Sequence, residues 1–178
     1  MGAIYVAVRI KQYVLPKVHR VRCNFSVLDG ITQKLIAIAE DNPDEVILLQ
    51  HAISRAKLPI SSFHFCLNGI EMTQFLERTA SAGAVPDLAL VDLKMPLMDG
   101  FEVIRWMRSH SDSEIKEIPI VVMTSSDEPS DNERARMLGC NEYVVKPRNL
   151  NELVSIMEGL YCGTIQFDPL IGKRGPVL

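Results

Sequence analysis

The sequence has no long hydrophobic run, no closely spaced cysteine pair and no low-complexity tract. Its four cysteines, at positions 23, 66, 140 and 162, favour reduced, partly buried thiols over a disulfide framework. The apolar N-terminal run is interrupted at Arg9, too early to cross a bilayer, and no basic residue precedes it as in a secretion signal. Val6 stands where a myristoylation motif needs Ser or Thr. We therefore predict a soluble, cytoplasmic protein without membrane insertion.

The net charge of −3 is unevenly distributed along the chain. Residues 1–33 carry +4, which leaves −7 for the remainder and argues against direct nucleic-acid binding by the main domain. With 178 residues, 47% of them apolar, the chain can bury the core of one domain. We predict a basic N-terminal extension over 1–33, a domain over 34–160 and a tail over 161–178. The tail is shorter than the ~50 residues that a further output domain requires.

From residue 34 onward, short apolar runs alternate with segments of helical periodicity, which is typical of repeated βα units. The run 88–92 is nearly all apolar, as expected of a central parallel strand that is buried on both faces. We predict an α/β fold with a doubly wound, five-stranded parallel sheet. The predicted strands are 35–39, 62–67, 88–92, 120–123 and 143–145, and the last two predicted helices are about 129–138 and 149–160.

Polar residues stand at the carboxyl ends of four of these strands. They are Glu40 and Asp41 after the first strand, Asp92 after the third, Thr124 after the fourth, and Lys146 with Pro147 after the fifth. In an open parallel sheet these ends border one crevice where ligands bind. Three carboxylates, a hydroxyl and an ammonium should therefore meet at one edge of the sheet.

This set of groups suits phosphoryl transfer with a metal ion. Asp41 and Asp92 would repel each other unless a cation or a proton lay between them, and Mg²⁺ prefers such oxygen ligands. Glu40 can hold a metal-bound water. A carboxylate can attack phosphorus, and Asp92 is the candidate because it ends the central strand. Lys146, the Thr124 hydroxyl and Mg²⁺ could then each bind one oxygen of the transferred group.

Four motifs carry a resemblance to a known family. They are Ala39–Asn42, Val91–Pro96 with Asp99–Gly100, Met123–Ser125 and Tyr143–Pro147. In order, spacing and strand-end placement they resemble the receiver domains of two-component response regulators, of the chemotaxis-regulator type, over residues 34–160. The resemblance implies a flavodoxin-like (βα)5 fold with strand order 2-1-3-4-5. It also implies a stand-alone regulator that accepts a phosphoryl group from a histidine kinase or a phosphotransfer protein, and not a turnover enzyme.

The resemblance also assigns roles to single residues. Asp92 would be the phosphoacceptor, Asp41, Asp92 and the backbone carbonyl of Lys94 would bind Mg²⁺, and Glu40 would act through water. Thr124 and Tyr143 would form a switch that alters the surface made by the helix 129–138, the strand 143–145 and the helix 149–160. A downstream protein target, or a second copy of the chain in a homodimer, would bind that surface.

Finer features are carried over in the same way. The small side chain of Ser125 would admit the phosphoryl group, whereas Lys94 and Ser126 would set how fast water removes it. The family pattern implies a cis peptide bond between Lys146 and Pro147. The segments 41–45, 80–86 and 124–126 are similar to those of single-domain regulators that are paired with phytochrome-type histidine kinases.

Three other protein classes share parts of this pattern. Phosphatases of the haloacid-dehalogenase type have a second Asp two residues after the nucleophile, where this chain has Lys94. A flavin-binding module of the same topology needs a phosphate loop after its first strand, where Glu40 and Asp41 would repel phosphate. A receiver fold that only binds proteins, without phosphorylation, would not need the acidic residues, Thr124 and Lys146 together.

Overall fold

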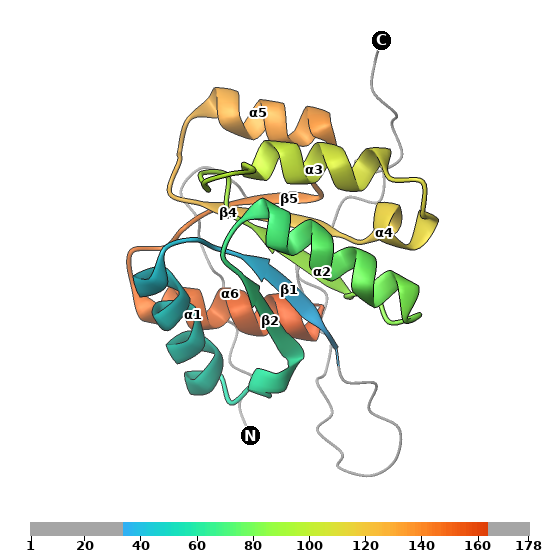
Figure 1. Cartoon of the computed structure of the whole chain (residues 1–178). Coiled ribbons are helices and arrows are strands. Elements are labelled where there is room, and N and C mark those ends of the chain that lie inside the picture. Colours follow the sequence, from blue (N-terminus) through green and yellow to red (C-terminus); the bar gives the residue numbers. More distant parts are fainter. Residues whose placement is uncertain (1–33, 164–178) are drawn as a thin grey trace.

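The computed structural model describes residues 34–163, which form one five-stranded parallel sheet between two layers of helices (Figure 1). The strand order is β2-β1-β3-β4-β5, as the resemblance implied. The elements are β1 (Ile36–Ala39), α1 (Pro43–Arg55), the 3₁₀ turn η1 (Ile60–Ser62), β2 (Phe63–Cys66), α2 (Gly69–Ser81), β3 (Leu88–Val91), α3 (Gly100–Ser109), α4 (Ser113–Glu117), β4 (Ile120–Thr124), α5 (Pro129–Leu138), β5 (Glu142–Val145) and α6 (Leu150–Cys162).

The predicted α/β fold and its five strands are confirmed, with small differences at the ends of elements. The short helix α4 was not predicted, because its five residues bury only Ile115 and show no full helical period. Helix α6 ends at Cys162, two residues beyond the predicted boundary, where Gly163 adopts a left-handed conformation. The predicted basic extension, residues 1–33, lies outside the described residues.

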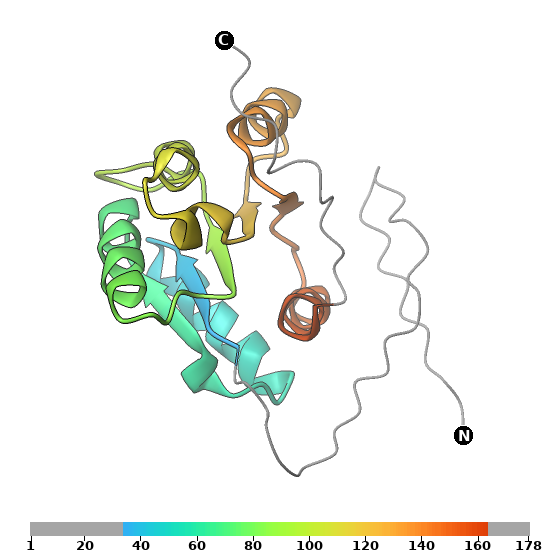
Figure 2. The same cartoon turned by 90° about the vertical axis from the view of Figure 1, so that its right-hand side faces the viewer.

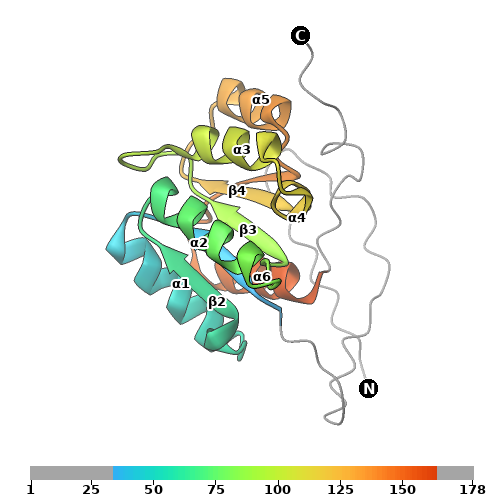
Figure 3. The same cartoon turned by 45° about the vertical axis from the view of Figure 1, so that its right-hand side comes forward.

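Alternate residues of the strands point to opposite faces of the sheet and so build two separate cores. Ile36 and Ile38 pack with the helices α1 and α6, whereas Ala37 and Ala39 pack on the side of α2, α3, α4 and α5. Figures 1 and 3 show these helices on the two faces of the sheet, and Figure 2 shows the layers from the side. Because both faces are covered, the ends of the strands are the free edge at which polar residues can gather.

Short loops follow the strands, and side chains fix where the next helix begins. The Asn42 side chain caps α1 by accepting a hydrogen bond from the Asp44 backbone N–H. Asp99 and Glu102 form a reciprocal capping box at the start of α3. These caps fix where α1 and α3 begin after the acidic strand ends, which limits the conformational freedom of the intervening residues.

Arg108, in α3, joins four segments on one side of the sheet. Its guanidinium donates to the carbonyl oxygens of Gly139, Lys116 and Ile118 at 2.7–3.0 Å. It also donates to Asn141 Oδ1 at 2.8 Å, an oxygen that accepts from the Ile120 backbone N–H as well. One side chain therefore holds α4, the C-terminal end of α5 and the starts of β4 and β5 against α3.

No helix within residues 34–163 is both long enough and apolar enough to cross a membrane.

We expect the substitution Arg108→Ala to lower the free energy of unfolding by about 2 to 3 kcal/mol, because four acceptors lose a charged donor. Chemical denaturation followed by circular dichroism measures this difference. Arg105→Ala is the matched control, since Arg105 is exposed on the same helix and should change stability by less than about 0.5 kcal/mol. Equal losses in the two variants would contradict the role assigned to Arg108.

Candidate functional site

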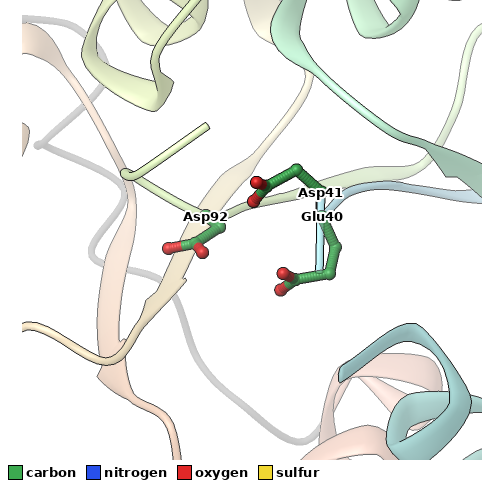
Figure 4. A group of neighbouring side chains, drawn as sticks. All are labelled: Glu40, Asp41 and Asp92. Atoms are coloured by element: carbon green, nitrogen blue, oxygen red, sulfur yellow. The ribbon is translucent and has the colours of Figure 1, made fainter. Parts of the chain in front are cut away.

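Three carboxylates meet at the carboxyl edge of the sheet (Figure 4). Glu40 and Asp41 follow β1, and Asp92 follows the neighbouring strand β3, with which β1 pairs in parallel register. One oxygen from each of the three side chains lies within 4.8 Å of the other two. Glu40 and Asp92 are buried, whereas Asp41 is half-buried. The sequence prediction that these side chains converge is confirmed.

The backbone ladder of the sheet holds these residues in place. The Asp92 N–H donates to the Ala39 carbonyl at 3.0 Å, and the Glu40 N–H donates to the Cys66 carbonyl at 2.9 Å. Asp92 Oδ1 accepts from the Leu93 backbone N–H at 2.6 Å. A Cβ atom at Gly100 would lie 2.2 Å from the Asp92 carbonyl oxygen, so only glycine allows α3 to begin this close to the site.

Lys146, at the end of β5, lies among the carboxylates. Its Nζ atom donates to Glu40 Oε2 at 2.7 Å and to Asp92 Oδ2 at 2.9 Å, and it forms an ion pair with Glu45 in the first turn of α1. Burial alone would lower the pKa of Lys146, but hydrogen bonds to the three carboxylates outweigh burial and raise it. Lys146 therefore keeps its positive charge in this crowded site.

The donor set fits a hard divalent cation. Glu40, Asp41 and Asp92 supply three carboxylates, and Lys146 is the single ammonium that forms an ion pair with Glu40 and Asp92 among the described residues, where it also contacts Glu45. Burial, together with the negative charges of Asp92 and Glu45, raises the pKa of Glu40 to about 7, against the opposing effect of the Lys146 hydrogen bond and charge. An all-oxygen site with excess negative charge is the environment that Mg²⁺ prefers.

Thr124 is the last residue of β4, and Tyr143 lies on the neighbouring strand β5. Thr124 is fully buried, and its carbonyl oxygen accepts from the Lys146 backbone N–H at 2.8 Å. The Tyr143 hydroxyl donates to the Ser126 carbonyl at 3.0 Å, and the Ser126 hydroxyl donates to Asp131 in α5 at 2.6 Å. A chain of hydrogen bonds thus links β5, the loop after β4 and the first turns of α5.

The residues predicted to tune the phosphoryl group occupy different environments. Lys94 and Ser125 are exposed in the loops that border the site. Ser126 is buried and its hydroxyl bonds to Asp131, so this side chain is engaged with α5.

The predicted cis peptide bond between Lys146 and Pro147 is wrong, since no peptide bond within residues 34–163 is cis. A bond that precedes proline prefers the trans form by about 0.5–1 kcal/mol. In this trans arrangement Lys146 makes its backbone bond to Thr124 and its side-chain bonds to Glu40 and Asp92.

Sequence reasoning gave Glu45 no place at the site. As an acidic residue in the first turn of a helix, Glu45 has the same sequence signal as Asp44, which is that both favour the start of that helix. The available signal was the position of Glu45 in the first turn of a helix that begins directly after the acidic pair. A residue in that turn starts at the same edge of the sheet as the pair.

Comparison with known proteins agrees with this geometry. Residues 36–158 match the response regulator receiver domain, and the chain belongs to this family. Receiver domains are partners of histidine kinases, and their phosphorylation chemistry takes place on the domain itself instead of on a substrate that is turned over.

Related proteins include regulators that are associated with phytochromes, as the sequence motifs suggested. The phosphorylated cyanobacterial phytochrome response regulator RcpA is 30% identical, with a TM-score of 0.65 over 76% of this chain and 98% of that one. The bacteriophytochrome response regulator AtBRR is 32% identical, with a TM-score of 0.58 over 71% of this chain and 91% of that one. The Mn²⁺-bound form of the response regulator Rcp1 is 26% identical, with a TM-score of 0.59, over 75% and 95% of the two chains.

A curated relative gives a shorter match. The polar-differentiation response regulator DivK of Brucella ovis is 33% identical over 73 residues, which are 41% of this chain and 58% of that protein. The chain therefore matches somewhat more than half the length of this relative.

We expect Tyr143 to ionise with a pKa of about 12, because burial raises the pKa of its phenol. The measurement records the phenolate absorbance of the wild type and of Tyr143→Phe against pH. The difference between the two curves is the titration of the Tyr143 hydroxyl. In the unfolded chain the same absorbance difference should titrate with a pKa of about 10. Since the unfolded chain loses this proton first, the free energy of unfolding should fall as pH rises from about 10 to about 12. A folded-state midpoint at the unfolded value would contradict the burial of this hydroxyl.

Proposed function

We propose that this protein is a response regulator in which Asp92 accepts a phosphoryl group from a phosphohistidine of a kinase or a phosphotransfer protein. One observation carries the proposal: the buried Asp92 carboxylate touches Lys146 and lies within 4.8 Å of the carboxylates of Glu40 and Asp41. A nucleophile, a fixed cation and a set of metal-ligand oxygens are thereby gathered around one point at the sheet edge.

Asp41, Asp92 and the backbone carbonyl of Lys94 are the proposed ligands of Mg²⁺, and Glu40 the residue that holds a metal-bound water. When bound, Mg²⁺ supplies positive charge to the phosphoryl oxygens and balances the carboxylates. The three-carboxylate cluster supports this assignment, because it lacks a sufficient positive charge of its own.

The chain's own residues supply the other parts of the transfer. An Asp92 oxygen forms a bond to phosphorus while the bond from phosphorus to the donor histidine nitrogen breaks, and that nitrogen keeps the electron pair. Lys146 binds one phosphoryl oxygen, and the Thr124 hydroxyl binds another. Ser125, next to Thr124, leaves room for the group, while Lys94 and Ser126 are the positions proposed to influence its lifetime.

The proposed output is a change of the surface that α5, β5 and α6 form. The Thr124 hydroxyl would move toward the phosphoryl oxygens and Tyr143 would respond, as in the receiver family. The hydrogen bonds from Tyr143 to Ser126 and from Ser126 to Asp131 support this route, since they connect the loop after Thr124 directly to α5. A downstream protein or a second copy of the chain is the proposed partner of this surface.

We expect wild-type protein with Mg²⁺ and acetyl phosphate to gain one acid-labile phosphoryl adduct, because Asp92 is the carboxylate that Lys146 and the backbone position for attack. Intact-mass spectrometry detects the adduct. Asp92→Asn should not form it, whereas the control Asp127→Asn, at an exposed aspartate, should behave as the wild type. An adduct of unchanged yield in Asp92→Asn would refute the assignment.

Mg²⁺ binding provides a separate test of the metal ligands. Isothermal titration calorimetry should show that Asp41→Ala weakens Mg²⁺ binding by about tenfold or more, because a ligand is lost. Asp44→Ala removes an exposed carboxylate three residues away and should leave the affinity near that of the wild type. If both variants bound Mg²⁺ as the wild type does, Asp41 would not be a ligand.

A further inference from the structure

Glu45 is the third carboxylate that contacts Lys146, and it is the most accessible of the three. Its side chain is 30% exposed, compared with 3% for Glu40 and 9% for Asp92. Glu40 and Asp92 are fixed at the ends of buried strands, whereas Glu45 reaches the ammonium from the first turn of α1. Because Glu45 already faces water, it is the partner that can leave Lys146 at the lowest desolvation cost.

The ammonium of Lys146 has no spare donor for a phosphoryl oxygen. A lysine ammonium carries three N–H groups, and here three carboxylates engage it. A phosphoryl group on Asp92 can therefore bind Lys146 only if one carboxylate gives up its contact with the ammonium. The buried Glu40 has less freedom to move away, and Asp92 itself carries the group.

The structure offers Glu45 a place to move. Glu45 and Lys146 line a hollow of about 390 Å³ between α1, the end of β4 and the start of α6. Arg148 lines the same hollow and adds a second positive charge there, and the exposed Asp127 lines it as well. Glu45 can thus leave Lys146 without entering the core or lacking a nearby cation.

We propose that Glu45 is a positioning residue that competes with the incoming phosphoryl group for Lys146, and so lowers the rate and the affinity with which this group is taken up. The inference rests on the proposed function and deepens it. It makes Glu45 a determinant of how readily the site is phosphorylated, at a position outside the residues that touch the reacting atoms.

The test compares Glu45→Gln with the wild type, using beryllofluoride as a stable mimic of the phosphoryl group. With Mg²⁺ present, Glu45→Gln should bind beryllofluoride about two- to fivefold more tightly, as expected when a partly exposed ion pair no longer competes. Its phosphorylation by acetyl phosphate should be faster by a similar factor. Affinity for Mg²⁺ alone should stay the same or fall, because a negative charge near the metal ligands is lost.

Tighter binding of beryllofluoride without tighter binding of Mg²⁺ separates competition from a general loosening of the site, which would weaken the binding of both ligands. Asp44→Asn is the matched control, since it removes an exposed carboxylate from the same helical turn. It should match the wild type in both measurements. Urea unfolding of both variants checks that the two substitutions affect the stability of α1 alike.

The possible outcomes are distinct. If Glu45→Gln binds beryllofluoride no more tightly than the wild type, or if Asp44→Asn gains as much, competition by Glu45 is refuted while the proposed function stands. If the wild type takes up neither beryllofluoride nor a phosphoryl group with Mg²⁺, the proposed function itself fails, and this inference fails with it.

Discussion

The contact between Lys146 and the carboxylates at the sheet edge is the interaction on which the site depends. Glu40 and Lys146 are 106 residues apart in the sequence, so their hydrogen bond exists only once β1, β3, β4 and β5 have all paired. Burying such charges costs desolvation that their attraction offsets only in part, so the cluster is poor evidence for added stability. Its physical consequence is instead a concentrated negative field, which attracts a metal ion, next to one fixed ammonium, which attracts the oxygens of a phosphoryl group.

The elements around this cluster differ in how tightly they are packed. The strands β1, β3 and β4 are buried throughout, and α3 begins against the Asp92 carbonyl, where Gly100 leaves no room for a side chain. Within α5, by contrast, Ala135 is the single buried residue, and Arg134 covers the Phe101 ring from outside at 3.9 Å. Few apolar contacts and exposed polar ones are the features of a segment that opens easily. A change at the acidic site can therefore move α5 more readily than the sheet.

The sequence was sufficient to predict the sheet, the strand-end placement of Asp92 and Lys146, and the acidic cluster, because periodicity and turn residues are local signals. The hydrogen-bond and ion-pair partners of single side chains could not be predicted from the sequence in the same way. Glu45 and Asp44 look alike in the sequence as acidic residues at a helix start, and only the contact of Glu45 with Lys146, which follows β5, distinguishes them. The hydrogen bonds of Arg108 depend on α4 and the loops that follow α4 and α5 lying together against α3. The bond before Pro147 is trans, whereas the family pattern implied a cis bond.

The two ends of α5 are held by different kinds of contact, so they differ in how readily they can move. At its C-terminal end the buried part of Arg108 fills the space beside Gly139 and bonds to its carbonyl, and Gly139 closes the helix in a left-handed conformation. At its N-terminal end, hydroxyl groups of Ser126 and Tyr143 make the connection. Hydroxyl donors can rotate to a new acceptor at small cost, whereas removing the Arg108 contacts would expose several unpaired carbonyls. The end of α5 nearest the carboxylates is thus the end that can rearrange while the core stays intact.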